Sequence, residues 1–192
     1  MIKTERFKKV EVTSAQELRI WLEVNGGKEA SVWLVTYKKH IPSKYVSVGE
    51  VLDELLCFGW VDGIRRKLDD DRTMQLISPR KAHHWAKTYK DRAARLKEEG
   101  RMQPAGLASI AASQRAGLWE LMDDVDALIR PPDLIDALDS CKAAGANFDA
   151  SSRSYQRNIL RWIKLARTPD TRAKRIGEVV SFAARNQKIK QM

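Results

Sequence analysis

The 192-residue sequence predicts an α+β protein: a small antiparallel sheet with flanking helices, followed by an all-helical C-terminal half. Up to about residue 82, segments rich in β-branched and aromatic residues alternate with segments whose apolar residues recur every three or four positions, as is typical of strands and helices. From residue 83 on, only the helical spacing continues. We therefore divide the chain into an α+β half, residues 1–82, and a helical half, residues 83–192.

Two helices are predicted in the first half, each opened by a serine. A serine followed three residues later by a glutamate is the signature of a capping box, and this pair occurs twice. Ser14 precedes a helix predicted over about residues 15–25, and Ser47 precedes a second helix predicted to end near Cys57. Gly59 is expected to close that second helix in the left-handed conformation.

Three strands are predicted in the first half. The string SVWLVTYKK, residues 31–39, is rich in β-branched and aromatic residues and reads as a buried strand. Residues 60–64 and 73–78 are predicted to pair as a hairpin around the acidic turn at 69–71, and Pro79 is expected to end the pairing.

The second half shows a series of helical patterns separated by glycine and proline. Gly100, Gly145 and the pair Pro131-Pro132 are expected to mark helix limits. The predicted helices cover about residues 84–99, 104–116, 118–128 and 133–144, with one that Ser151 or Ser152 opens and a last one that Asp170 or Thr171 caps.

The composition argues against several classes of protein. Hydrophobic residues make up 43% of the chain, which is too much for a disordered protein. The longest apolar runs are about four residues, whereas a membrane-spanning helix needs about 20, and the N-terminal residues lack the apolar stretch of a secretory signal. Cys57 and Cys141 are far apart in the sequence, unlike the cysteines of disulfide-rich secreted domains. We expect a cytoplasmic protein without a membrane span, and its oligomeric state stays open.

The net charge of +10 is concentrated at the two ends. Residues 1–10 carry +3 and residues 151–192 carry +9, so the remainder of the chain is close to neutral. Such asymmetry suggests an anionic partner, either a nucleic acid or an anionic surface. Because the sequence contains no DNA-binding motif, solvated helix faces that aid solubility are the favoured explanation. The candidate anion-binding residues lie on one face of a predicted helix: Arg153, Arg157, Arg161 and Lys164.

A second group of residues could line a ligand pocket. It combines three tryptophans from separate predicted elements with one cation and one carboxylate: Trp33, Trp60, Asp62, Arg80 and Trp85. Aromatic walls with a few polar groups are typical of ligand sites. The alternative is that the tryptophans are core residues and that Asp62 and Arg80 form a structural pair.

The sequence gives weak signals for catalysis. Cys57 is a candidate nucleophile, but a thiol at a helix C-terminus has a raised pKa and is more often a core residue. His83 and His84, together with Cys57 and Asp62, have ligand chemistry, but their spacing matches no common metal site. We predict no metal and no cofactor, and the sequence leaves enzymatic activity undecided, with a non-enzymatic role favoured.

The chain also carries a set of short motifs in a fixed order over about 150 residues. They are VWLVTYKK (32–39), DELLCFGWVDG (53–63), SPRK (78–81) followed by Trp85, Gly100-Arg101-Met102 with Pro104, Gly106 and Leu107, Gly117 with Trp119, and LARTPDTRAKRI (165–176). Together they resemble the YdeI/OmpD-associated bacteriocin-protection family of bacterial proteins. The resemblance implies a YjbR/CyaY-like fold for residues 1–82, a helical YdeI/OmpD-associated half over residues 83–192, and a cytosolic role in protection against bacteriocins or cationic antimicrobial peptides. It implies no reaction.

The chain departs from that family after the Pro-Arg pair. Where the family has the string Ser-x-Trp-Ser-x-x-Asn, this sequence has His83, Trp85, Ala86 and Tyr89. If those polar groups line a ligand site, this protein binds a different ligand there or has lost the site.

These observations favour a non-enzymatic cytoplasmic binding or stress-resistance protein whose aromatic and arginine-lined pocket takes an unidentified small ligand or peptide. Because like charges repel, a basic protein is a poor direct receptor for a cationic peptide. Two alternatives stay open. One is a nucleic-acid or anionic-surface binder that uses the basic C-terminal helices, and the other is an enzyme of unidentified reaction that uses Asp62, Arg80 or Cys57.

Overall fold

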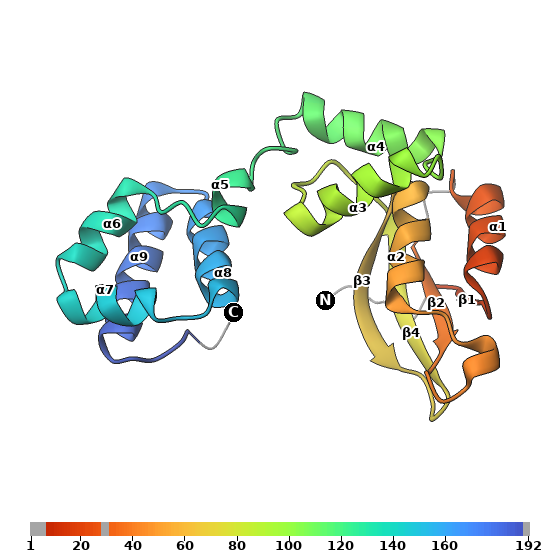
Figure 1. Ribbon diagram of the computed structural model, residues 1–192, viewed down its shortest axis with the longest axis horizontal. Helices are drawn as coiled ribbons and strands as arrows, with labels where there is room; N and C mark the ends of the chain where they lie inside the picture. The colour runs from red at the N-terminus through yellow and green to blue at the C-terminus, as the bar shows by residue number, and fades with distance from the viewer. Residues whose placement is uncertain (1–6, 28–30, 190–192) are drawn as a thin grey trace. The chain divides into compact units, whose positions relative to one another are not determined.

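A computed structural model describes residues 7–27 and 31–189, and it confirms the α+β class. The chain forms two compact units, Met1–Glu120 and Leu121–Met192 (Figure 1). The change from strands to helices near residue 82, on which the sequence-based division rests, falls inside the first unit. Two helices beyond that point, α3 and α4, belong with the sheet.

The first unit contains a sheet and four α-helices among its described residues. Its elements are β1 (Lys9–Glu11), α1 (Ala15–Asn25), β2 (Val32–Tyr37), a 3-10 turn (Pro42–Lys44), α2 (Val48–Cys57), β3 (Trp60–Lys67), β4 (Arg72–Pro79), α3 (Lys87–Glu98) and α4 (Pro104–Arg115). Both serine caps are confirmed: Ser14 Oγ accepts from the backbone N–H of Glu17, and Ser47 forms the complete capping box with Glu50. Gly59 has a φ of 69°, as expected after α2.

The sheet is mixed, which corrects the antiparallel prediction. Its strand order is β1-β2-β4-β3, with antiparallel pairing among β2, β4 and β3 but parallel pairing of β1 with β2. Strand β1 was not predicted. It is only three residues long, so it has no alternation that sequence reading could detect, and it forms because β2 offers a free edge.

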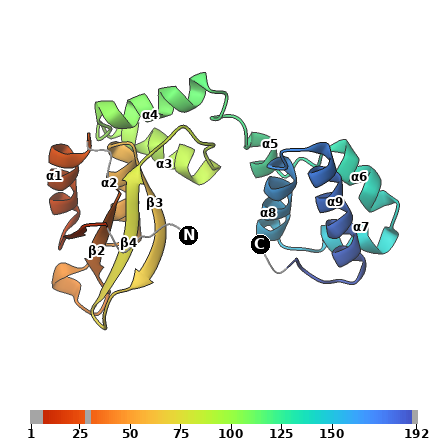
Figure 2. The same cartoon turned by 180° about the vertical axis from the view of Figure 1, so that it is seen from behind.

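Helices α1 and α2 cover one face of this sheet (Figures 1 and 2). Val32, Leu34 and Ile77 point to that face, where they meet Leu18 of α1 and Leu55 of α2 in one buried core. Because side chains alternate along a strand, residues between them point to the opposite face of the sheet. The core also includes Ala93 and Leu96, which explains why α3 packs with the sheet.

The second unit is helical and has a core of its own. Its helices are α5 (Asp123–Asp126), α6 (Pro132–Asp139), α7 (Lys142–Asp149), α8 (Arg153–Lys164) and α9 (Pro169–Ala184). Leu134, Phe148, Ile159 and Val179 are buried together between them.

The helix predicted over residues 133–144 is wrong, because two helices occupy that stretch. α6 ends at Asp139, and Cys141 has an extended backbone before α7 begins. Gly145 therefore lies inside α7 rather than at a helix end. A Cβ there would be 3.5 Å from the Leu138 carbonyl oxygen, which is an ordinary contact. The packing of Gly145 against the end of α6 therefore does not require a glycine.

Two other helix limits in the second unit differ from prediction. The helix expected over residues 118–128 is reduced to α5, and Leu128 has a left-handed backbone with a φ of 60° that ends it. The last helix begins earlier than expected. Thr168 caps it and Pro169 is its first residue, a position that proline favours because its missing N–H has no helical partner to lose.

Because each unit has its own core, residues 1–120 and 121–192 are expected to fold as separate fragments. Each should give a cooperative thermal transition by circular dichroism. A fragment of residues 1–82 is the control, and it should not fold cooperatively because it lacks Trp85, Ala93 and Leu96 of the first core. A well-folded fragment 1–82 would show that the first unit does not need residues 83–120.

Candidate functional site

The structure brings three of the five predicted pocket residues together. Arg80 follows β4, Trp85 lies between β4 and α3, and Asp62 lies on β3. The guanidinium carbon of Arg80 lies 3.9 Å from the centroid of the Trp85 ring. Tyr89 of α3 joins the group, because its ring centroid is 5.8 Å from that carbon and its hydroxyl donates to Asp62 Oδ1 at 2.7 Å.

The other two predicted residues lie apart from this cluster. Trp33 points to the opposite face of the sheet, where the guanidinium carbon of Arg66 lies 5.4 Å from its ring centroid. Trp60 is buried on the helix-covered face, where its indole N–H donates to the Gly26 carbonyl oxygen at 3.2 Å and its ring meets Trp21 edge-on. Strand alternation separates Trp33 from the rest.

Arg80 is a half-buried cation without a carboxylate partner among residues 7–27 and 31–189. Its Nη2 donates to the His84 carbonyl oxygen at 3.5 Å, which is the long limit for a hydrogen bond, and its Nε is buried without an acceptor in the described chain. Burial lowers the pKa of Arg80, and the nearby Tyr89 and Asp62 oppose that shift. A buried N–H without an acceptor costs about 1–3 kcal/mol, so this arrangement calls for an explanation.

Other arginines of the first unit contrast with Arg80. Arg19 and Arg101 pair with Glu54 at 3.0 and 2.6 Å, and Arg92 pairs with Asp53. These guanidinium groups stabilise the fold by neutralising two buried carboxylates. Arg80 makes no such pair in the described residues, so structural charge neutralisation does not account for it.

Asp62 has a positioning role in the cluster. Its two carboxylate oxygens accept from Tyr89 Oη at 2.7 Å and from Gln75 Nε2 at 3.0 Å. Burial, followed by the hydrogen bond to Asp62, raises the pKa of Tyr89 to about 12, so Tyr89 keeps its proton at neutral pH. Sequence reasoning did not include Tyr89 or Gln75 in the pocket. The one sequence feature that pointed to Tyr89 was its departure from the family pattern described above.

Trp85 provides a fixed surface for Arg80. Its indole N–H donates to Ser113 Oγ of α4 at 2.9 Å, and both side chains are fully buried. Its ring also packs against Trp119, with 4.9 Å between centroids. Two anchors hold the ring, and the ring in turn holds the guanidinium in place by cation–π stacking.

The segment that carries Arg80 is electropositive. Residues 79–90 contain no Asp or Glu, while Lys81 and His83 are exposed on this stretch. The ring centroids of His83 and His84 lie 4.0 Å apart. A ligand that approaches Arg80 from solvent therefore meets positive charge, which attracts anions.

The nucleophile and metal hypotheses gain no support. Cys57 is completely buried, and burial, followed by the charge of Glu54, raises the pKa of its thiol. A buried thiol with a raised pKa is a poor nucleophile. Within the described residues, no group of three or more His, Cys, Asp and Glu is arranged to hold a metal ion, and none of the helices there is long and apolar enough to cross a membrane.

The predicted basic stripe lies on α8, but acidic neighbours neutralise part of it. Lys164 Nζ contacts both carboxylate oxygens of Asp124 at 2.6 and 2.7 Å, and Arg157 Nε lies 3.5 Å from Asp126 Oδ1. The complete second unit has thirteen Lys and Arg against nine Asp and Glu, so its excess charge is well below that of residues 151–192. The remaining members are Arg153, which is exposed, and Arg161, whose Nε is buried without an acceptor in the described chain.

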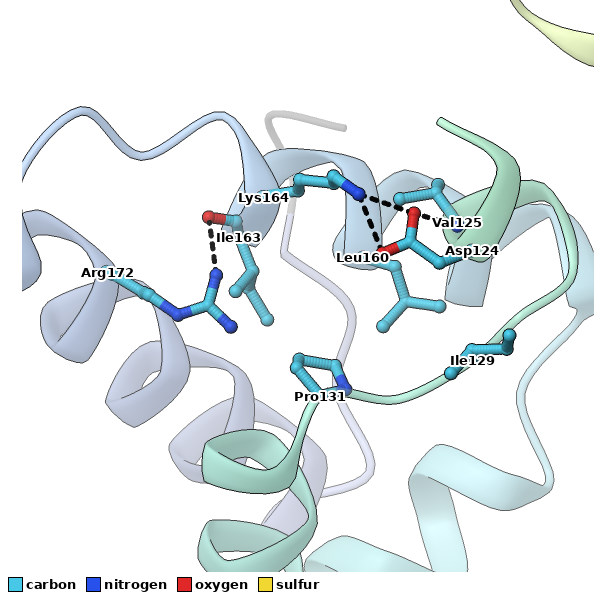
Figure 3. Close-up of a pocket in the computed structure, with 8 residues that line it drawn as sticks. All are labelled: Asp124, Val125, Ile129, Pro131, Leu160, Ile163, Lys164 and Arg172. Atoms are coloured by element: carbon cyan, nitrogen blue, oxygen red, sulfur yellow. Dashed lines mark hydrogen bonds and ion pairs between the residues drawn. The ribbon is translucent and has the colours of Figure 1, made fainter. Parts of the chain in front are cut away.

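A small pocket lies beside this stripe in the second unit (Figure 3). Its volume is about 140 Å³, and its lining includes the apolar side chains of Ile129, Pro131 and Leu160. Two cations also line it, but Lys164 is paired with Asp124, and Arg172 with Asp133, which lies outside the pocket lining. The pocket therefore offers apolar surface rather than free positive charge.

Comparison with known protein families covers both units. Residues 10–109, just over half of the chain, match the family model described as a domain of unknown function, DUF8412. The chain belongs to the DUF8412 family. The motifs at residues 32–39, 53–63 and 78–81 lie within this match, so this DUF8412 region contains the candidate site around Arg80.

The second unit matches a different model. Residues 127–186 match the family described as "Bacteriocin-protection, YdeI or OmpD-Associated", which confirms the predicted family for this part of the chain. The LARTPDTRAKRI motif lies there. No curated protein and no solved structure matches the chain.

Proposed function

We propose that this protein is a non-enzymatic, cytoplasmic binding protein that contributes to bacteriocin protection, and that Arg80 binds an anionic group of its ligand. The match of the second unit to a bacteriocin-protection family supports the biological role. The half-buried Arg80, stacked on Trp85 without a carboxylate partner in the described chain, supports the binding role and is the observation on which the proposal rests. The first unit would serve as the binding module, with the YjbR/CyaY-like fold inferred from its motifs.

A carboxylate or phosphate group is the ligand chemistry that fits Arg80 best. Guanidinium groups bind both through parallel N–H donors, and partial burial strengthens such contacts because water competes less. Because Arg80 Nε is buried, an anion from solvent would meet the guanidinium through a terminal Nη group, and it would supply the acceptor that Nε lacks only if the side chain turns outward. The positive charge of segment 79–90, which also carries Trp85 and Tyr89, would favour its approach.

The test is an NMR titration of the full chain with inorganic phosphate and, separately, with acetate. The side-chain Nε–H signal of Arg80 and the indole N–H signal of Trp85 report on the site directly. Both should shift in a saturable way. Arg80→Lys should weaken binding at least about tenfold, because lysine lacks the planar donor pair.

Arg66→Lys is the matched control. Arg66 is also an arginine over a tryptophan ring, but it is exposed and lies on the opposite face of the sheet. Its replacement should leave both anion affinities unchanged. Both substitutions keep the positive charge, so equal losses in the two variants would show that binding does not depend on the Arg80 guanidinium in particular. The absence of saturable shifts in the wild-type protein would rule out the site.

A further inference from the structure

Strand β1 forms an open edge of the sheet. The strand order places β1 at one end, with β2 as its only neighbour in the described sheet. The N–H of Trp33 donates to the Lys8 carbonyl oxygen and the N–H of Val12 donates to the Val35 carbonyl oxygen. Since backbone groups alternate in direction along a strand, the N–H and C=O groups of Lys9 and Glu11 point away from β2, toward the free edge.

An apolar groove runs beside this edge. It has a volume of about 400 Å³ and lies between β1 and α1, with Val10 and Val12 on one side and Ile20, Trp21 and Val24 on the other. Val24 is 70% exposed and Ile20 is 51% exposed, although both belong to a helix whose inner face is fully buried. Unpaired strand edges and exposed apolar side chains are each unfavourable in isolation, and here they are adjacent.

The edge is complementary to itself. In an antiparallel pairing of two β1 strands about a two-fold axis at Val10, Lys9 of each copy lies opposite Glu11 of the other. Both residues have outward-pointing backbone groups, so each Lys9–Glu11 pair would exchange two hydrogen bonds, giving four in total. Opposite charges directly across a strand pair are also favourable. The Glu11 carboxylate already accepts from Tyr37 Oη and from Arg72 Nη1, each at 2.6 Å, so the facing Lys9 ammonium would join this group rather than meet a free carboxylate. An extended peptide of another sequence could form the same backbone bonds, but a second copy of β1 presents the complementary Lys9–Glu11 register by symmetry.

We propose that a second copy of this chain binds at this surface, through antiparallel pairing of two β1 strands. The pairing would join the two sheets into one, with both α1 helices on the same face. Ile20 and Val24 of the two copies would then cover the apolar groove. Only a short strand and a small groove take part, so the dimer belongs to the weak class of interfaces, with a dissociation constant between about 1 μM and 1 mM.

The test is sedimentation equilibrium of the full chain over about 1 μM to 1 mM protein. The wild-type chain should show a monomer–dimer equilibrium. Lys9→Pro should weaken it at least about tenfold, because it removes two of the four intermolecular hydrogen bonds and leaves the bonds to β2 intact. Val24→Asp should also weaken the dimer, because it places a charge in the apolar groove. Lys97→Glu, at an exposed position on α3, is the control for altered charge and should leave the equilibrium unchanged.

A pair of charge variants makes the test specific. Lys9→Glu places two carboxylates on one edge. Glu11→Lys places two ammonium groups on one edge and also removes the acceptor of Tyr37 and Arg72 within the same copy, so the mixture of the two variants is the decisive measurement. Each variant should therefore dimerise poorly alone, but a mixture of the two should form a heterodimer, since all the facing charges are then opposite. A monomeric wild-type chain, including one that binds an extended peptide at β1, would overturn the proposal. A dimer that is insensitive to Lys9→Pro would overturn it too.

Discussion

Glu54→Gln is expected to lower the free energy of unfolding of the first unit by about 3 kcal/mol. Glu54 is only 4% exposed, and its carboxylate oxygens accept from Arg19 Nη1 at 3.0 Å and from Arg101 Nη2 at 2.6 Å. A glutamine of the same shape cannot neutralise either guanidinium, which would leave Arg19 with the longer contact to Glu23 at 3.5 Å and Arg101 with the one to Glu99 at 3.3 Å. Removing one partner of a buried ion pair costs more than the pair contributes, because the remaining charges stay partly desolvated.

Hydrogen exchange of amides in α2, measured by mass spectrometry, isolates the stability of the first unit from that of the second. Glu98→Gln is the matched control, because Glu98 is exposed on α3. It should change stability by less than about 0.5 kcal/mol. A loss for Glu54→Gln as small as that of the control would show that the carboxylate is not part of the network that holds α1, α2 and the segment after α3 together.

The same network gives the first unit a dependence on pH through Asp53. Burial alone would raise the pKa of Asp53, but hydrogen bonds from Arg95 and Arg92 outweigh it and lower the pKa below its ordinary value of 3.8. The corresponding stability is present above pH 3.8 and is lost as the pH falls through the lower folded-state value. The stability difference between the wild-type protein and Asp53→Asn should therefore shrink below about pH 4.

Local sequence signals predicted the helices of the first unit well. The limits of α2 depend on Ser47, Glu50 and Gly59, all close together in the chain, so their effect does not depend on distant residues. Strand β1 depends on β2, more than twenty residues away, and three residues carry no periodicity of their own. The break between α6 and α7 was missed for a related reason. The apolar spacing continues across Ser140, although the helix does not.

Three of the five residues grouped from the sequence, Arg80, Trp85 and Asp62, lie together in the structure. Arg80 and Trp85 are five positions apart, and they stack on each other. Trp33 was grouped with them as one of three tryptophans on separate predicted elements, but the direction of its side chain depends on the register of the sheet. Tyr89 could not be placed without knowing that α3 packs against α2 in a position from which Tyr89 reaches Asp62 of β3. Whether side chains from different helices and strands meet depends on how those elements pack, which the sequence patterns used here do not reveal.

Gly106→Ala is expected to destabilise the first unit by about 2 kcal/mol or more, against the usual stabilising effect of alanine in a helix. Gly106 lies in the first turn of α4, directly against the end of α2. A Cβ at this position would come within 2.7 Å of the Leu56 carbonyl oxygen and 2.8 Å of the Cys57 carbonyl carbon. Both atoms are backbone, so no side chain can rotate away, and α4 would have to move.

Such a shift of α4 would disturb two contacts at once. The N–H of Gln103 donates to the Cys57 carbonyl oxygen at 2.9 Å, and Ser113, farther along α4, holds the indole of Trp85. The close approach at Gly106 therefore links the packing of α4 on α2 to the position of the Trp85 ring, on which Arg80 stacks. Gly106→Ala should accordingly weaken anion binding as well as stability in the titration of Arg80 described above.

Gly177→Ala is the control that separates the close approach from helix propensity. Gly177 is an exposed residue inside α9, and a Cβ there meets nothing within 4 Å. The same substitution should therefore stabilise the second unit by about 0.5–1 kcal/mol. Hydrogen exchange measured separately in α2 and α9 should show effects of opposite sign for the two variants. If Gly106→Ala were neutral or stabilising, the tight packing of α4 on α2 would be incorrect, because no rearrangement of flexible side chains could relieve a contact with backbone atoms.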